Sequence, residues 1–336
     1  MWTAAADFSA AVTADAAVVA AGATDAIESV APAARPMAET TAAIMVVYKH
    51  PRELESALRQ LGSVLPQVVV VDNAEHADAG LAALAKTLKC GYLHGANVGG
   101  LAGAYNRALT VVRQRWPAAE QVVLLDEDSD ASSLPAFLAD SDTRAALALP
   151  GTAAVSPAYR DRATGLRGRY IWLRRFRLGF NPREFTGLRD VAFLINSMSV
   201  WRLAAIDQVG AFNQNLAVDH VDTEYCLRAR QRGLHVVVNG SFEFPHAIGD
   251  RKKYKLFGME VQAGGHSPQR RYMIGRNTAW LARGWVLREP AFAALCMARL
   301  AYEAVGIVLA ETRVCAKLWA LLRGAVNGLF TRMGRA

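Results

Sequence analysis

The sequence has few cysteines, and they are not grouped as in a disulfide-rich or zinc-binding protein. Its 336 residues contain four cysteines, which are widely separated and include no CxxC pair: Cys90, Cys226, Cys296 and Cys315. Secreted disulfide scaffolds are dense in cysteine, and structural zinc sites commonly use CxxC pairs. The spacing argues against both classes, and we expect reduced cysteines in a cytoplasmic protein.

Long apolar runs and several well-known motifs are also missing. No stretch of about 20 residues is both apolar and free of charge, so the sequence alone predicts no membrane-spanning helix. The chain has no GxGxxG after its first apolar run, no GxxxxGK[ST] and no HExxH. These absences argue against a Rossmann dehydrogenase, a P-loop nucleoside triphosphatase and an HExxH metalloprotease.

The charge of the chain is unevenly distributed. The formal net charge is +8, but residues 1–40 hold five acids against Arg35, which leaves +12 on the other 296 residues. A positive surface favours anionic partners such as nucleotides, nucleic acid or an anionic membrane. The basic residues form no known nucleic-acid-binding motif, so we do not expect nucleic acid as a partner.

Composition divides the chain into three parts. The first 40 residues contain 16 alanines, and Asp15 interrupts their most apolar stretch, which is not typical of a signal peptide. We expect a disordered alanine-rich leader at 1–40, a catalytic domain at 41–285 and an amphipathic helical region at 286–336. The catalytic domain is expected to comprise a nucleotide-binding half (41–130) and an acceptor half (131–285).

Short apolar runs alternate with helical patterns over the first part of the catalytic domain. The runs expected to form strands are 43–48, 67–72, 92–94 and 121–126, with helices between them around 54–61, 81–88 and 102–116. Weaker strand signals follow at 153–156, 191–196 and 235–239, and a helix is expected at 223–232. Apolar runs that alternate with helices predict an α/β fold with a mainly parallel sheet. Ligands of such sheets bind beyond the carboxyl ends of the strands.

Acidic residues follow two of these apolar runs. Asp126-Glu127-Asp128 ends the fourth run, and a divalent cation bound to a diphosphate would relieve the repulsion among its carboxylates. Asp72 ends the second run, where it could accept hydrogen bonds from a base or a ribose. The alternatives are a solvated acidic turn at the first position and ordinary turn chemistry at the second.

A glycine-rich segment opens the third expected helix. Gly99, Gly100 and Gly103 lie between Asn97 and Asn106. Glycine lets the backbone approach a ligand closely, and a helix N-terminus attracts phosphate. The alternative is a turn that packs its helix closely against the sheet.

Two further candidates lie in the second half of the catalytic domain. Asp222 stands among three acids at the start of the helix expected at 223–232, where it is either part of a helix cap or a general base facing a pocket. His246 follows a strand-like stretch and is either structural or a metal ligand.

Together these segments resemble the family 2 glycosyltransferases, and within them the rhamnosyltransferase-like branch, from about Ala43 to Trp285. The matching segments, in order, are Val46-Val47-Tyr48, Val71-Asp72-Asn73, Asn97-Val98-Gly99-Gly100 with Asn106, Leu125-Asp126-Glu127-Asp128-Ser129, Ile195-Asn196-Ser197, Gly210-Ala211-Phe212, the run from Val218 to Arg228, the run from Phe244 to Asp250, and His266-Ser267-Pro268 with Arg270, Arg271, Tyr272 and Arg276-Asn277. The specificity of the match comes from their order and positions. The resemblance implies a GT-A fold.

The resemblance also implies an activity and a role for each matching residue. The activity is inverting transfer of a sugar from a nucleoside diphosphate, which in this branch is dTDP-L-rhamnose. Tyr48 and Asp72 would hold the base and ribose, and Asp222 would deprotonate the acceptor hydroxyl. The implied ligands of Mg²⁺ or Mn²⁺ are Asp126, Asp128 and His246. The other implied donor-binding residues are Asn97, Gly99, Gly100, Asn106, Arg270 and Arg271.

Two positions depart from the pattern of that family. Lys49 stands where a neutral residue is usual, so it would either touch the donor phosphate or be solvated. Glu127 stands where Gln or Asp is common in this branch, which bears on donor specificity more than on catalysis.

The C-terminal region indicates contact with a membrane or with protein. If 291–323 formed one continuous helix, most of its charged residues would gather on one side: Arg299, Glu303, Arg313 and Lys317. The rest of the helix surface would be a broad apolar face. Such a helix could lie on an anionic membrane surface, pack on the catalytic domain or form an oligomer interface. We expect a peripheral protein at the inner face of the cell membrane, with a glycan or lipid-linked acceptor.

The sequence thus supports two functional hypotheses. The first is a metal-dependent inverting glycosyltransferase that builds a cell-surface glycan. The alternative is a catalytically silent GT-A-like binding or scaffold protein at the membrane. A silent protein is expected to lack the acidic motif or the base, and this sequence has candidates for both.

Overall fold

The computed structural model describes residues 36–49, 53–246, 252–256, 259–263 and 265–331. Most of the predicted leader, up to Arg35, lies outside these ranges. The described chain begins with the short helix α2 (Met37–Thr40), which leads directly into the first strand.

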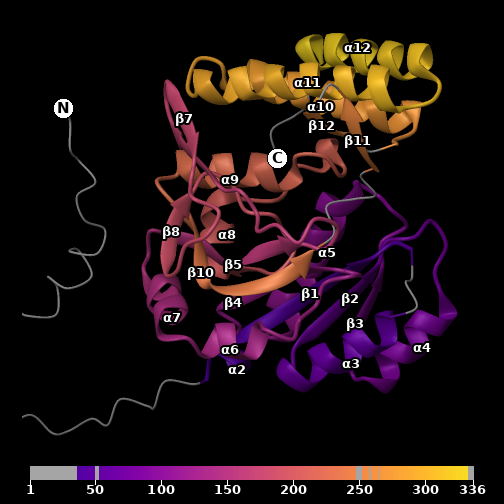
Figure 1. The fold of residues 1–336 in the computed structure, drawn as a ribbon. Helices are drawn as coiled ribbons and strands as arrows, with labels where there is room; N and C mark the ends of the chain where they lie inside the picture. The colour runs from indigo at the N-terminus through magenta and orange to yellow at the C-terminus, as the bar shows by residue number, and fades with distance from the viewer. Residues whose placement is uncertain (1–35, 50–52, 247–251, 257–258, 264, 332–336) are drawn as a thin grey trace, which may run out of the picture. The chain divides into compact units, whose positions relative to one another are not determined.

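Strands and helices alternate through the first part of the structure (Figure 1). These elements are β1 (Thr41–Val47), α3 (Leu54–Val64), β2 (Val68–Asp72), α4 (Ala79–Thr87), β3 (Gly91–His94), α5 (Gly100–Arg115) and β4 (Gln121–Asp126). The next elements are α6 (Leu134–Ala139), α7 (Ser141–Ala148), β5 (Thr152–Asp161), β6 (Ile171–Arg174), β7 (Arg177–Phe180), β8 (Leu188–Val191), β9 (Ser199–Arg202), α8 (Leu203–Val209), the 3₁₀ turn η1 (Gln214–Leu216), α9 (Val221–Gln231) and β10 (His235–His246). The last are β11 (Lys252–Leu256), β12 (Met259–Ala263), α10 (Pro268–Trp285), α11 (Pro290–Ala310) and α12 (Val314–Phe330).

Eight strands form one mixed sheet in the order β3-β2-β1-β4-β9-β5-β10-β8. Parallel pairing joins β3 to β2, β2 to β1, β1 to β4 and β5 to β10. Strand β9 is antiparallel to both β4 and β5, and β8 is antiparallel to β10. Six strands therefore run in one direction, and their carboxyl ends lie along one edge of the sheet.

The central strands are buried on both faces because helices cover each side. Along β1 every residue is buried, and alternate side chains enter different clusters: Ile44 packs with α5 and α9, whereas Met45 packs with α3 and α6. Such strands read as continuous apolar runs in the sequence. The predicted fold class, a mainly parallel mixed sheet flanked by helices with a helical C-terminal extension, is confirmed.

One predicted strand was placed wrongly. The run 191–196 was expected to be a strand, but β8 ends at Val191 and the next strand, β9, begins at Ser199. Between them the N–H of Leu194 donates to the sulfur of Cys226, and the backbone carbonyl of Asn196 accepts from the Ser199 hydroxyl, so side chains supply part of the hydrogen bonding of this segment. Apolar content alone could not distinguish it from a strand.

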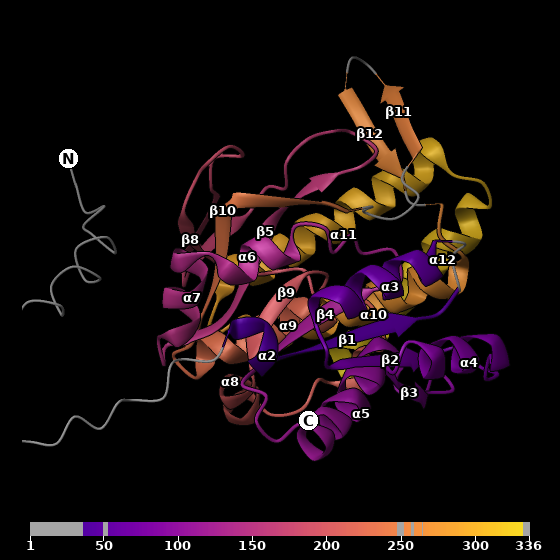
Figure 2. The same cartoon turned by 90° about the horizontal axis from the view of Figure 1, so that it is seen from below.

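The C-terminal region consists of two helices, so the continuous helix considered at 291–323 does not form. The chain leaves α11 at Ala310 and enters α12 through Arg313, whose φ is +58°. Helix α12 packs so closely on α10 that a Cβ added at Gly324 would stand 2.1 Å from the carbonyl oxygen of Tyr272. In Figure 2 the separate pair β11–β12 lies apart from the main sheet, and β12 contacts α11.

The three C-terminal helices enclose a cluster of charged side chains. Arg271 of α10 is fully buried and pairs with Glu303 of α11 and with Glu311, which follows α11. Lys317 of α12 also binds Glu311, with 2.7 Å between Nζ and Oε2. The charges predicted to gather on one side of a helix therefore serve mainly to join helices.

Among the described residues, α11 is the one helix that is long and apolar enough to cross a membrane. Its sequence was not expected to do so because Arg299 and Glu303 interrupt the apolar run. Length and composition alone are weak evidence for a span.

Candidate active site

The acidic motif lies at the carboxyl end of β4, as the sequence predicted. Asp126 is the last residue of the strand, and its backbone N–H donates to the hydroxyl of Ser129, which is also hydrogen-bonded to Ser197. Burial raises the pKa of the Asp126 carboxyl to about 7, and the charges of Asp128, Asp222 and Glu127 add to that effect. The acids thus lie close enough to repel one another at the edge of the sheet where the carboxyl ends of the parallel strands lie. We call this edge, with Asp126, Asp128 and Asp222, the strand edge.

Asp128 is exposed and lies within electrostatic reach of His246, at the end of β10. Burial lowers the pKa of His246, and the charge of Asp128 partly opposes this effect. The imidazole also packs edge-on against Tyr159, with 6.1 Å between ring centroids. Arg162 donates to the backbone carbonyl of Asp128 at 3.1 Å and places a cation beside the acidic motif. The sequence did not reveal this role of Arg162.

A metal ion bound by two carboxylates fits this arrangement better than one bound by three protein ligands. Among the described residues, no group of three or more His, Cys, Asp or Glu side chains stands close enough to hold a metal ion. The predicted set of Asp126, Asp128 and His246 is therefore not assembled. Mg²⁺ commonly takes one or two carboxylates together with substrate phosphates, and a cation would relieve the repulsion that raises the pKa of Asp126.

Glu127 has a role in local structure that the sequence did not reveal. Its Oε2 accepts hydrogen bonds from the backbone N–H groups of Tyr48 and Lys49, both at 2.7 Å. These groups follow the end of β1, where no neighbouring strand accepts them. The middle residue of the acidic motif therefore fixes the start of the segment that carries the predicted base-binding tyrosine.

Tyr48 lines an open cavity of about 530 Å³ together with Lys49 and residues 74–79. Asp72 stands behind this segment and is fully buried. The Asp72 carboxylate accepts from the N–H groups of Ala74 and Asp78 and from the hydroxyl of Tyr92, at 3.2, 2.8 and 2.8 Å. Asp72 therefore shapes the cavity wall, whereas Tyr48, which is 49% exposed, is accessible from the cavity.

The glycine-rich turn packs against another loop of the protein. Gly100 has a φ of +59°, and an added Cβ would stand 2.4 Å from the carbonyl oxygen of Ala217. That same carbonyl accepts a hydrogen bond from the N–H of Leu101 at 2.7 Å, and a Cβ at Gly99 would meet Gln214. The turn thus packs against the loop that leads to Asp222, whereas the alternative drawn from the sequence was packing of its helix against the sheet. The role of Gly99 and Gly100 in donor binding stays a prediction.

Asn97 and Asn106 also make contacts within the protein. The Oδ1 of Asn97 accepts from Asn73 at 3.3 Å. Asn106 forms two hydrogen bonds with the backbone of Phe212, donating to its carbonyl at 2.9 Å and accepting from its N–H at 2.8 Å. These contacts tie α5 to the loops around the strand edge, and the predicted role of both residues in donor binding stays a prediction.

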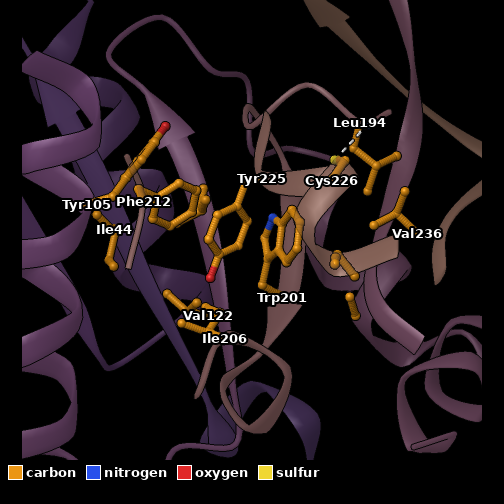
Figure 3. Close-up of a cluster of buried hydrophobic side chains, with 14 of the residues drawn as sticks. Ile44, Tyr105, Val122, Leu194, Trp201, Ile206, Phe212, Tyr225, Cys226 and Val236 are labelled. Atoms are coloured by element: carbon orange, nitrogen blue, oxygen red, sulfur yellow. Dashed lines mark hydrogen bonds between the residues drawn. The ribbon is translucent and has the colours of Figure 1, made fainter. Parts of the chain in front are cut away.

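Asp222 lies in the first turn of α9, and Tyr225 of the same helix belongs to an aromatic stack in the core (Figure 3). Phe212 stacks on Tyr225 with 3.8 Å between ring centroids, and Tyr105 and Trp201 pack on either side. Burial raises the pKa of Asp222, and hydrogen bonds from the N–H and hydroxyl of Thr223 partly offset the rise. A carboxyl with a raised pKa near Asp126 has properties suited to a general base.

Tyr105 is a further feature that the sequence did not reveal. Its side chain is fully buried and its hydroxyl has no hydrogen-bond partner among the described residues. Burial raises its pKa well above the usual value, and the charges of Asp126 and Asp222 contribute. The phenol therefore stays protonated beside these two carboxyls.

The structure engages the two predicted arginines in different places. Arg270 pairs with Asp219 at 2.9 Å, three residues before Asp222. Arg271 is enclosed in the charge cluster with Glu303 and Glu311. Arg270 thus adjoins the loop of the predicted base, whereas Arg271 contributes to the packing of the C-terminal helices.

Comparison with known proteins gives one sequence relative and several structural neighbours. A stretch of 75 residues is 41% identical to the dTDP-rhamnosyl transferase RfbF of Shigella flexneri and covers 22% of this chain and 24% of that protein. The chain therefore spans about a quarter of the length of this curated relative. No protein-family model matches the chain. Its sequence resembles rhamnosyltransferase-like glycosyltransferases, the class that the motifs indicated.

The structural neighbours match at low sequence identity. TarS from S. aureus matches with a TM-score of 0.46 and 14% identity over 86% of this chain and 54% of TarS. A protein described as mannose-1-phosphate geranyltransferase from Thermus thermophilus matches with a TM-score of 0.37 and 14% identity over 61% of this chain and 75% of its own.

Proposed function

We propose that this protein is an inverting, metal-dependent glycosyltransferase of family 2 that transfers L-rhamnose from dTDP-L-rhamnose to a hydroxyl of a lipid-linked or growing cell-surface glycan. The observation that carries the proposal is the grouping of Asp126, Asp128 and Asp222 at the strand edge, where burial and neighbouring charge raise the pKa of Asp126 to about 7. Residues 41–285 would form the catalytic domain.

The donor would bind in the cavity beside this group of carboxylates. Tyr48 offers an accessible aromatic ring for the base, and the loop shaped by Asp72 provides backbone groups for the ribose. Lys49 lines the same cavity and Arg162 lies beside Asp128, so both are cations suited to the diphosphate. The similarity of part of the chain to a dTDP-rhamnosyl transferase supports dTDP-L-rhamnose as the donor.

Asp126 and Asp128 would hold Mg²⁺ or Mn²⁺, with His246 nearby. When bound, the metal ion neutralises the charge that develops on the diphosphate as it leaves. Asp222 would accept the proton of the acceptor hydroxyl as that oxygen attacks the anomeric carbon. The raised pKa of Asp222 makes it a better proton acceptor than an ordinary aspartate.

A thermal-shift screen of nucleotide sugars with and without Mn²⁺ tests this function. Ligand binding should raise the melting temperature with dTDP-rhamnose and Mn²⁺ together. Asp128→Ala should abolish the metal-dependent part of the shift, whereas Asp130→Ala, in the same loop, should retain it. Absence of both binding and donor turnover across the panel would overturn the proposal.

A turnover assay distinguishes the glycosyltransferase from the second hypothesis, a catalytically silent binding protein. A silent protein would bind the nucleotide sugar but neither transfer nor hydrolyse the sugar with any acceptor tested. The presence of both the acidic motif and a candidate base in the sequence favours the enzyme, because a silent protein is expected to lack one of them.

A further inference from the structure

Helix α11 has its charges on the inside and its apolar side chains on the outside. Its charged residues, Arg299 and Glu303, are only partly exposed, and Glu303 pairs with buried Arg271. The exposed positions of α11 carry only apolar or aromatic side chains: Ala294, Met297, Ala298, Ala301, Tyr302, Val305, Val308 and Leu309. Met297 and Val308 are 58% and 55% exposed. We call these eight residues the outer face of α11.

The apolar surface continues at the corner between α10 and α11. There Leu287 is 83% exposed and lies next to the exposed Arg288. The β6–β7 hairpin reaches the same end of α11, because the N–H of Ala291 donates to the carbonyl of Arg175 (Figure 1). Phe176 at the tip of this hairpin is 72% exposed. Aromatic and aliphatic side chains with interspersed arginines are typical of surfaces that enter a membrane interface.

A cavity of about 470 Å³ lies beneath this hairpin. Among the residues that the structure describes, three arginines and Trp172 line it, and Asp190 is the one acidic residue there. Arg174 and Arg177 are direct cross-strand partners, and neither forms an ion pair within the part of the chain that the structure describes. Like charges directly opposite each other destabilise a hairpin, so an anion between them would remove a cost.

The third arginine connects the cavity to α11. Arg230 pairs with Glu289, the residue before α11, at 3.1 Å and donates to the carbonyl of Leu173 at 2.9 Å. The cavity and the start of α11 therefore share a common wall.

Charge favours an anionic membrane over a second copy of this chain. Between residues 286 and 331 the exposed charged side chains are Arg288, Arg313 and Arg323, and all three acids of the segment are at least partly buried. A two-fold dimer brings the same patch of both subunits together, which would oppose arginines to arginines. An anionic bilayer surface instead attracts each of them.

We propose that the outer face of α11, the α10–α11 corner and the arginine-lined cavity beneath the β6–β7 hairpin dock this protein on an anionic lipid bilayer, with a headgroup phosphate between Arg174 and Arg177. This deepens the membrane contact expected of the proposed function, and it identifies the surface. Helix α11 lies in the interface and does not cross it, because its inner side stays bound to α10 through Arg271 and Glu303.

Vesicle sedimentation of the full chain tests the proposal without any donor or acceptor. Wild-type protein should bind vesicles of phosphatidylglycerol and phosphatidylcholine, and bind pure phosphatidylcholine far more weakly. Val308→Glu and Leu287→Glu should each reduce affinity by about tenfold or more, since each replaces an inserted apolar group by a charge. Leu149→Glu changes an exposed apolar residue outside the face and is the matched control.

The arginine component has its own measurement. Arg174→Ala and Arg177→Ala should each weaken binding to phosphatidylglycerol vesicles by about fivefold at low ionic strength. The effect should be smaller at high ionic strength and absent on phosphatidylcholine. Arg144→Ala, an exposed arginine outside the face, should have little effect. Thermal unfolding of every variant checks that the fold is retained.

Three outcomes would overturn the proposal. One is equal binding of Val308→Glu and Leu149→Glu to anionic vesicles. The second is a dimer in vesicle-free ultracentrifugation that Val308→Glu dissociates, which would assign the face to a second copy. The third is binding of soluble glycerol phosphate that depends on Arg177 while vesicle binding does not. Failure of nucleotide-sugar binding would overturn the proposed function and leave the vesicle result unchanged.

Discussion

The strand edge and the C-terminal helices treat charge in opposite ways. At the strand edge, Asp126 and Asp222 are acids whose pKa values are raised by burial. In the helical region, burial would also raise the pKa of Glu311, but hydrogen bonding to Lys317 and the charge of Arg271 lower it instead. The first arrangement leaves carboxylates in need of a cation or a proton, whereas the second satisfies its charges internally. The strand edge thus has the properties of a ligand site, whereas the charged cluster of the C-terminal helices has the structural role of holding the helices together.

The largest expected effect tests the strand edge as a site. Asp222→Asn keeps the shape of the side chain but removes its ability to accept a proton. Loss of a general base typically costs about 10²- to 10⁴-fold in rate, and we expect the rate of sugar transfer to fall by that much. Donor binding, measured by thermal shift with Mn²⁺, should stay close to that of the wild type. Full transfer activity in this variant would show that another group is the base.

The next effect tests the structural role of the charged cluster that the C-terminal helices enclose. Glu311→Gln leaves Arg271 and Lys317 without their shared carboxylate in a buried position. Breaking a buried pair by removing one partner typically costs about 3–5 kcal/mol, and we expect the free energy of unfolding in denaturant to fall by this amount. Asp128→Asn, at the exposed strand edge, is the control and should cost much less. Similar losses in both variants would remove the distinction between the two regions.

A smaller effect tests how closely α12 packs against α10. Gly324→Ala places a methyl group where the carbonyl oxygen of Tyr272 stands 2.1 Å away, so α12 must move from α10. Overpacking of this kind costs about 1–3 kcal/mol. Gly284→Ala in α10 is the matched control, because an added Cβ there meets nothing within 4 Å. That change should stabilise the helix by about 0.5–1 kcal/mol. Denaturant unfolding of both variants provides the comparison.

The sequence predicted the sheet well because its central strands are buried on both faces. The runs at β1, β2 and β4 are continuously apolar, and each leads to a polar residue at the same edge. The edge strand β3 was predicted at 92–94, whereas the edge strand β8 and the hairpin β6–β7, of which only part is buried, were not. Strand β9 was also missed, although it is mostly buried in the middle of the sheet. The pair β6–β7, with its arginines and aromatics, has no apolar run that could mark it.

The candidate site was predictable in its position but not in its internal contacts. Strand ends indicated Asp126 and Asp72, since parallel strands bring their carboxyl ends together. No local pattern could show that Asp72 would bind its own loop, or that Gly100 would pack against Ala217, 117 positions further along the chain. Such contacts depend on the tertiary fold. The matched arginines likewise gave no sign that Arg271 is paired with two distant glutamates.

The smallest expected effect uses pH to separate the two kinds of carboxyl. A folded-state pKa above the ordinary value, as for Asp222, makes ionisation in the folded protein unfavourable, so Asp222→Asn should gain stability over the wild type at neutral pH. That gain should disappear as pH falls below the ordinary value of 3.8. Glu311 has a lowered pKa, so it contributes stability above its ordinary value of 4.5 that is lost as pH falls through the folded-state pKa. The melting-temperature deficit of Glu311→Gln should therefore shrink in acid. Parallel pH profiles for the two variants would contradict the opposite shifts that distinguish the strand edge from the helical cluster.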